Sequence, residues 1–147
     1  MKRYQSLIGL LPVVLLACQN NTNKSVLIDA KVDQHCYVYS NNKDSASLTV
    51  TTNGPNISGK LAYYLFEKDS NTGTIKGELR GDTLIADYTF NSEGIESVRQ
   101  VVFLKKEGKL LSGFGEVVEK DGVTRFKDLS KLTFDNLLQF TPTACKY

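Results

Sequence analysis

Residues that often mark an enzyme are scarce in this chain of 147 residues, which has no tryptophan, one histidine and three cysteines. His35 accompanies no serine or cysteine in a recognisable nucleophile motif, so the sequence predicts no catalytic triad. No C-x-x-C or H-x-x-x-H spacing predicts a metal site. Gly113-Phe114-Gly115 lacks the following Lys-Ser or Lys-Thr of a phosphate-binding loop. These absences weigh against an enzyme, a resident metal and a cofactor.

An excess of charge of one sign is also missing. The formal net charge is +2, and Lys2 and Arg3 account for both units, so residues 18–147 carry 16 basic and 16 acidic side chains. A protein that binds nucleic acid presents a basic surface to the phosphates, so a neutral body argues against such a partner. With 41% hydrophobic and 23% charged residues, the composition is typical of one globular domain.

The N-terminal apolar stretch is too short to span a membrane. It covers the ten residues 7–16, whereas a spanning helix needs roughly 20, and it contains Pro12. Lys2 and Arg3 precede the stretch and Ala17 follows it. This pattern predicts a cleavable export signal over residues 1–17.

The end of this signal resembles a motif of known function. Leu15-Leu16-Ala17-Cys18 is similar to the lipobox of bacterial lipoproteins, in which a peptidase cuts before the cysteine. The cysteine of that family then carries a thioether-linked lipid and an N-acyl chain. The resemblance implies that Cys18 is the lipid attachment site and that the membrane is a partner. An ordinary secretory signal that happens to contain a cysteine is the alternative.

The residues after Cys18 bear on location. In the family, an aspartate after the cysteine often signals retention in the inner membrane, and this chain has Gln19 there. The resemblance therefore implies the outer membrane, on its periplasmic or surface face. Residues 19–25 are all polar, so residues 18–34 are expected to be the lipidated cysteine and a flexible tether. Residues 35–147 are expected to form the folded domain.

The other two cysteines, Cys36 and Cys145, are expected to form a disulfide. Exported compartments are oxidising, and an even number of cysteines remains once Cys18 is acylated. A soft metal held by the two thiols and His35 is the alternative.

From residue 36 onward, apolar and polar side chains alternate, and turn signals interrupt the pattern about every ten residues. Leu84, Ala86 and Tyr88, for example, share one face of a predicted strand. A helical turn is expected around residues 135–139. Strands are expected at residues 36–39, 47–52, 61–66, 74–79, 84–90, 96–105, 110–119, 123–127 and 129–134.

About eight strands joined by short links predict an all-β antiparallel meander, because loops of two to five residues cannot make parallel crossovers. A meander of this size hides its edges by closing into an up-and-down barrel. A β-sandwich is the alternative.

Strand number and hairpin order resemble the calycin-type small barrels, such as lipocalin-like and avidin-like proteins. Residues 72–77 (TGTIKG), 81–88 (GDTLIADY) and 92–99 (SEGIESVR) are similar to uncharacterised small lipoproteins of Gram-negative bacteria. That second resemblance covers Cys36 to Cys145 and implies no activity.

Four polar residues form the first candidate site. Glu93 and Glu96 lie on a predicted hairpin, Arg99 follows three residues later, and Glu116 belongs to the next strand. An inward-facing Arg99 could pair with a carboxylate and line a cavity, and two carboxylates could serve as general acid and base. Cross-strand ion pairs on the solvated face are the alternative.

Aromatic side chains are the second candidate set. They either fill a small barrel as core or line a ligand cavity, and Tyr88 belongs to the face expected inside. Tyr63 and Tyr64 are neighbours, so one points inward and the other outward. The outward tyrosine is a candidate contact residue.

We interpret the chain as a lipid-anchored envelope protein that binds a small apolar ligand, an envelope protein or a glycan without catalysis. A carboxylate-based hydrolase and a periplasmic enzyme inhibitor are the alternatives. An open apolar cavity would favour ligand carriage, whereas a closed core with an exposed aromatic patch near Tyr64 would favour protein or glycan contact. Two acids facing each other in a cleft would favour the hydrolase. The sequence indicates no oligomeric state.

Overall fold

The computed structural model describes residues 33–68 and 70–146. The predicted signal, Cys18 and most of the predicted tether lie outside the described residues. The described chain is almost entirely β-structure. Its strands are β1 (Asp33–Ser40), β2 (Ser45–Asn53), β3 (Asn56–Tyr64), β4 (Asn71–Arg80), β5 (Thr83–Ser92), β6 (Ile95–Lys106), β7 (Lys109–Phe114), β8 (Val117–Lys120), β9 (Val123–Phe126) and β10 (Thr133–Thr143).

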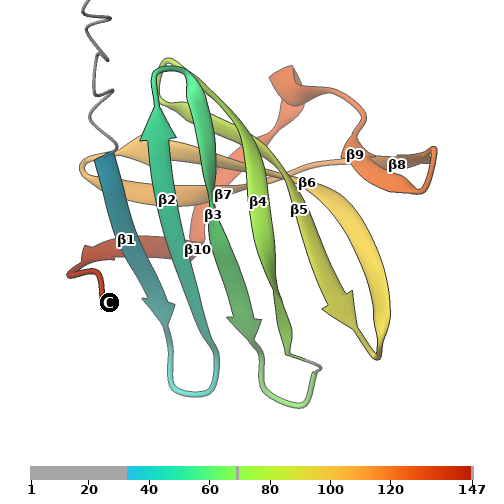
Figure 1. Ribbon diagram of the computed structural model, residues 1–147, viewed down its shortest axis with the longest axis horizontal. Helices are drawn as coiled ribbons and strands as arrows, with labels where there is room; N and C mark the ends of the chain where they lie inside the picture. Colours follow the sequence, from blue (N-terminus) through green and yellow to red (C-terminus); the bar gives the residue numbers. More distant parts are fainter. Residues whose placement is uncertain (1–32, 69, 147) are drawn as a thin grey trace, which may run out of the picture.

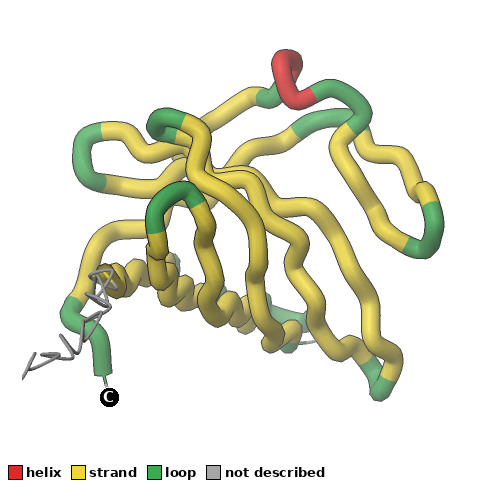
Figure 2. The backbone as a smooth tube through the Cα atoms, turned by 45° about the horizontal axis from the view of Figure 1, so that its top comes forward, coloured by secondary structure: helices red, strands yellow, loops and turns green. Residues whose placement is uncertain are grey.

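Eight of these strands close into an antiparallel up-and-down barrel, as the sequence predicts (Figure 1). The order around the barrel is β1-β2-β3-β4-β5-β6-β7-β10, and β10 pairs with β1 to complete the circle. The extra hairpin β8–β9 lies outside the barrel, against the first half of β6 (Figure 2). The contact between β6 and β9 is parallel, in contrast to the expected all-antiparallel pairing.

Turn chemistry explains the register of the hairpins. Five hairpins have two-residue loops, and all five contain a glycine with positive φ. At Glu93-Gly94 both φ values are positive, 50° and 80°, as the type I′ turn between twisted strands requires. These tight turns confirm the turn positions read from the sequence.

Three details near the C-terminus differ from the prediction. The strand expected over residues 110–119 is split into β7 and β8, and residues 129–131 form a 3₁₀ helix rather than a strand. The helical turn expected at residues 135–139 is wrong, because these residues bulge within β10 between the pairs Phe134–Gly113 and Gln139–Leu111. Pairing with β7 overrides the local preference, and the bulge packs Leu138 against the core.

Large side chains of the protein itself fill the barrel interior. Tyr88, Phe103 and Phe140 are at most 1% exposed. The Phe140 ring packs edge-on against Phe103 and Tyr63, with ring centres 5.6 and 6.5 Å apart. The core is therefore packed as one aromatic and aliphatic cluster.

Inward-facing glycines allow the strands to coil this tightly. A Cβ atom built at Gly59 overlaps the backbone carbonyl oxygen of Thr49, and one built at Gly77 overlaps that of Ile85. No side chain fits at either position without moving a neighbouring strand. The glycines thus bring adjacent strands into close approach where the barrel curves.

Cys36 and Cys145 form the expected disulfide. Cys36 lies in β1 and Cys145 follows β10, so the bond joins the two strands that close the barrel. The two ends of the folded domain are therefore held together on one side of the wall.

The alternation of strands gives the barrel two distinct ends (Figure 1). We call the entry end the one where β1 begins at Asp33, which also carries the β2–β3 and β4–β5 turns. We call the far end the one that carries residues 41–44, residues 65–68 and the β5–β6 turn. This polarity decides which surfaces face the N-terminal segment and which face away from it.

Candidate functional site

The structure brings Arg99 and Tyr88 together inside the barrel. They are register partners on β5 and β6, and the Arg99 guanidinium lies over the rings of Phe90, Tyr88 and Tyr63, at 4.9, 5.5 and 5.6 Å from their centres. Among residues 33–68 and 70–146, no carboxylate lies within ion-pair distance of Arg99. Cation–π contacts therefore stabilise its charge, rather than the carboxylate considered from the sequence.

The three candidate glutamates lie elsewhere. Glu93 is in the exposed β5–β6 turn, and Glu96 is exposed on the outer side of β6. Glu116 lies between β7 and β8 and pairs with Lys127 at 3.2 Å, both side chains being well exposed. The structure does not join these acids to Arg99 in one cluster.

Tyr63 and Tyr88 are two polar side chains buried inside the barrel. Burial raises the pKa of Tyr63 and of Tyr88 to about 12, although the charge of Arg99 acts in the opposite direction on both. Both phenols are therefore neutral at ordinary pH. The Tyr88 hydroxyl is buried with no hydrogen-bond partner among the described residues. A buried, unpaired hydroxyl costs stability rather than adding to it.

Tyr88→Phe is accordingly expected to raise the free energy of unfolding by about 1 kcal/mol, because it removes the unpaired hydroxyl and keeps the ring. Tyr39→Phe is the matched control, since the Tyr39 hydroxyl accepts a hydrogen bond of 2.7 Å from Asn41. That control is expected to lower stability by about 0.5–1 kcal/mol. Urea denaturation measures both changes. A loss of stability in Tyr88→Phe would show that its hydroxyl is hydrogen-bonded.

An exposed aromatic patch occupies the far end of the barrel. We define the far-end patch as Tyr64, Phe66 and Lys43. Tyr64 and Phe66 are 50% and 49% exposed, and the Lys43 ammonium lies 4.1 Å from the centre of the Phe66 ring. Tyr64 is therefore the outward member of the Tyr63–Tyr64 pair. Exposed aromatic rings beside a cation are typical of contact surfaces.

Hydrogen bonds hold the far-end patch in place. Asp44 accepts a bond of 2.8 Å from the backbone NH of Phe66 and one of 3.0 Å from Asn41. These bonds hold the pKa of the Asp44 carboxyl below its usual value. Asn41 in turn accepts bonds from the backbone NH groups of Lys43 and Asp44. The two turns are thus linked, so the patch is ordered before a partner arrives.

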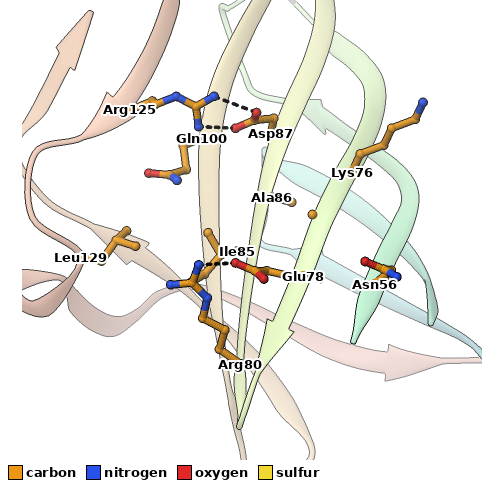
Figure 3. Close-up of a pocket in the computed structure, with 11 residues that line it drawn as sticks. Asn56, Lys76, Glu78, Arg80, Ile85, Ala86, Asp87, Gln100, Arg125 and Leu129 are labelled. Carbon is orange, nitrogen blue, oxygen red and sulfur yellow. Dashed lines mark hydrogen bonds and ion pairs between the residues drawn. The ribbon is translucent and has the colours of Figure 1, made fainter. Parts of the chain in front are cut away.

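A polar groove of about 420 Å³ lies on the outer wall, between β4–β5 and the segment that carries β9 and the 3₁₀ helix (Figure 3). Arg125 donates two parallel hydrogen bonds to Asp87, of 2.8 and 2.9 Å, which also raise the pKa of Arg125. Arg80 pairs with Glu78 in the same groove. Both carboxylates of the groove are therefore paired with an arginine. Because Asp87 is in β5 and Arg125 is in β9, their two hydrogen bonds hold the extra hairpin against the barrel.

A second hollow of about 440 Å³ lies on the wall formed by β1 to β4, beside the disulfide. Its charged residues are Lys60, Lys76 and Lys146, and its lining contains no aspartate or glutamate. No motif in the sequence marks these three lysines. Lys60 and Lys76 occupy the outward positions of the alternating pattern, but only the register of β3 and β4 places them together. The Asp87–Arg125 pair, 38 residues apart, left no signal in the sequence.

In the part of the chain that the structure describes, no group of three histidine, cysteine or acidic side chains is placed to hold a metal ion. No helix of that part is long and apolar enough to cross a bilayer. Comparison of the chain with protein-family models, curated proteins and solved structures finds no match.

Proposed function

We propose that the protein is a lipid-anchored envelope protein that binds a partner protein through the outside of a filled barrel, without catalysis. The observation that carries this proposal is the contrast between interior and surface. Tyr88, Phe103 and Phe140 occupy the interior, whereas Tyr64 and Phe66 are half exposed at the far end. A packed interior favours surface contact over carriage of a ligand in the barrel.

The polarity of the barrel supports the same proposal. The chain enters at Asp33, and the far-end patch lies at the opposite end. A lipid on Cys18 would attach the barrel through its entry end and leave Tyr64 and Phe66 at the end remote from the attachment point. The patch has the composition of an interface centre, because aromatic side chains contribute much binding free energy at little cost in conformational entropy.

The alternative of a carboxylate hydrolase has less support. Such an enzyme needs two acids that face each other across a cleft. Glu93 and Glu96 are exposed, and Glu116 pairs with Lys127. In the groove of Figure 3, Asp87 and Glu78 are each paired with an arginine. Surface binding therefore remains the proposal that this geometry supports best.

Photo-crosslinking in the producing cells tests the partner contact. A photoreactive phenylalanine analogue at Tyr64 is expected to give one discrete adduct that a protease degrades. The same analogue at Leu137, which is 75% exposed but outside the patch, is expected to give none. Phe66→Ala is expected to weaken the Tyr64 adduct about tenfold, as the loss of a central contact does. Equal adducts from both positions, or none from Tyr64, would refute the contact, and a protease-resistant adduct would indicate a glycan.

A further inference from the structure

We define the lysine wall as Lys60, Lys76 and Lys146. The hollow that these lysines line offers them no carboxylate to neutralise their positive charge. The hollow that these residues line is about 440 Å³ and contains no acidic residue. In the described residues, none of the three ammonium groups lies within ion-pair distance of a carboxylate. Residues 18–147 as a whole carry equal numbers of basic and acidic side chains, so this is a local excess.

Lys76 also lines the groove of Figure 3, and both carboxylates of that groove are already paired. Asp87 is the register partner of Lys76 across β4 and β5, but both of its oxygens accept bonds from Arg125. Glu78, on the same face of β4, pairs with Arg80. Each acid is therefore matched by an arginine, and the lysines remain as the unmatched charges.

Register brings two of these lysines close together. Lys60 pairs with Thr74 and Ser58 pairs with Lys76, so Lys60 and Lys76 are diagonal neighbours on adjacent strands. Like charges at such positions repel each other. Thr49 and Thr51 add hydroxyl groups to the same hollow. Ammonium and hydroxyl donors together match the oxygens of a phosphate group.

The lysine wall also adjoins the point where the chain enters the barrel. Gln34, the second described residue, lines the hollow, as do Cys36 and Cys145. Fourteen residues, 19–32, separate the proposed lipid site at Cys18 from Asp33. A chain of that length reaches at most roughly 50 Å. A membrane anchor would therefore keep the lysine wall near the lipid headgroups.

We propose that Lys60, Lys76 and Lys146 dock the barrel on the phosphate headgroups of an anionic bilayer. The position of the bilayer rests on the lipid anchor proposed above, whereas the recognition chemistry rests on the lysines alone. All three lysines are exposed, and they come from β3, β4 and the C-terminal segment, which suits a surface carrying many phosphates. The anchor supplies a high effective concentration, so weak electrostatic contacts suffice to orient the domain. Docking would lay the wall of β1 to β4 along the membrane, with the far-end patch at one side of the docked barrel.

Lysine footprinting of the full acylated protein tests the docking. The protein is reconstituted into vesicles of phosphatidylcholine alone or of phosphatidylcholine and phosphatidylglycerol in equal parts, and amine acetylation is followed by mass spectrometry. Lys60, Lys76 and Lys146 are expected to react about fivefold more slowly in the anionic vesicles, and high salt should remove the difference. Lys43, Lys68 and Lys120, which are exposed on other elements, should react equally in both.

Matched charge variants complete the test. Lys60→Gln, Lys76→Gln and Lys146→Gln together are expected to lower partition of the unacylated Cys18→Ser chain, prepared without residues 1–17, into anionic vesicles roughly 100-fold. The triple control Lys43→Gln, Lys68→Gln and Lys120→Gln removes the same charge and is expected to cost less than threefold.

The outcomes separate this inference from the anchor. Binding to both vesicles without protection of the lysine wall would overturn the docking and leave the anchor intact. No binding to phosphatidylcholine, with protection in anionic vesicles, would overturn the anchor and support the docking. No binding to either vesicle would overturn both. Equal protection by inorganic phosphate without vesicles would show a small-anion site and overturn the membrane docking.

Discussion

Replacing both Cys36 and Cys145 with alanine is expected to lower the free energy of unfolding by about 4–5 kcal/mol. The bond joins residues 109 apart in sequence. Its loss therefore increases the conformational entropy of nearly the whole unfolded domain. The bond also lies beside the pairing of β1 with β10 that closes the barrel, which we call the seam and which is short. β1 and β10 share three register pairs, whereas β1 and β2 share eight. One of the three involves Pro142, which has no NH to donate.

Urea denaturation of the oxidised protein and of the double variant measures this effect. Reduced wild-type protein is the control and should match the double variant, because both lack the cross-link. A difference below about 1 kcal/mol between oxidised protein and variant would mean that strand pairing alone closes the barrel. A far larger loss, with no folded state, would mean that the seam does not form without the bond.

Phe140→Ala is expected to destabilise the protein by about 3–5 kcal/mol. Phe140 is 0% exposed and its ring contacts the rings of Phe103, Tyr63 and Tyr39. Truncation leaves a cavity among aromatic rings held on four strands, which cannot move inward together. The same strand, β10, also closes the barrel, so loosened packing here weakens the seam next to the disulfide.

Leu137→Ala is the matched control for Phe140→Ala. Leu137 lies three residues earlier in β10, and its side chain is 75% exposed because the bulge turns it outward. Its truncation is expected to change stability by less than about 0.5 kcal/mol. Thermal or urea unfolding of both variants gives the comparison. A loss below about 1 kcal/mol in Phe140→Ala would show that the aromatic core is loosely packed and open to ligands.

Local patterns were sufficient to predict most strands and turns. Alternation in residues 84–90 placed Leu84, Ala86 and Tyr88 on one face, and all three are buried. The alternation has a direct cause, because successive side chains of a strand point to opposite sides. The turn at Glu93-Gly94 is also predictable, since it ends a polar run and Gly94, with a φ of 80°, adopts a conformation that favours glycine.

Local patterns failed where pairing between distant strands decided the outcome. Residues 135–139 have no strand alternation, yet they belong to β10 because β7 pairs on both sides of their bulge. One candidate group rests only on proximity in the sequence, and the structure does not bring its members together: Glu93, Glu96, Arg99 and Glu116. Arg99 turned inward onto aromatic rings, because its register partner is Tyr88 and alternation gives both the same face.

The meander of about eight strands, its turns and the pairing of Cys36 with Cys145 are predictable from the sequence, because they depend on the strand period, the turn residues and the number of cysteines. Three features are visible only in the folded barrel: the filled interior, the pair of Asp87 with Arg125, and the common wall of Lys60, Lys76 and Lys146. Those features depend on the register and curvature of strands far apart in the chain. A side chain's neighbours across a barrel are set by closure of the whole sheet, which no local pattern contains.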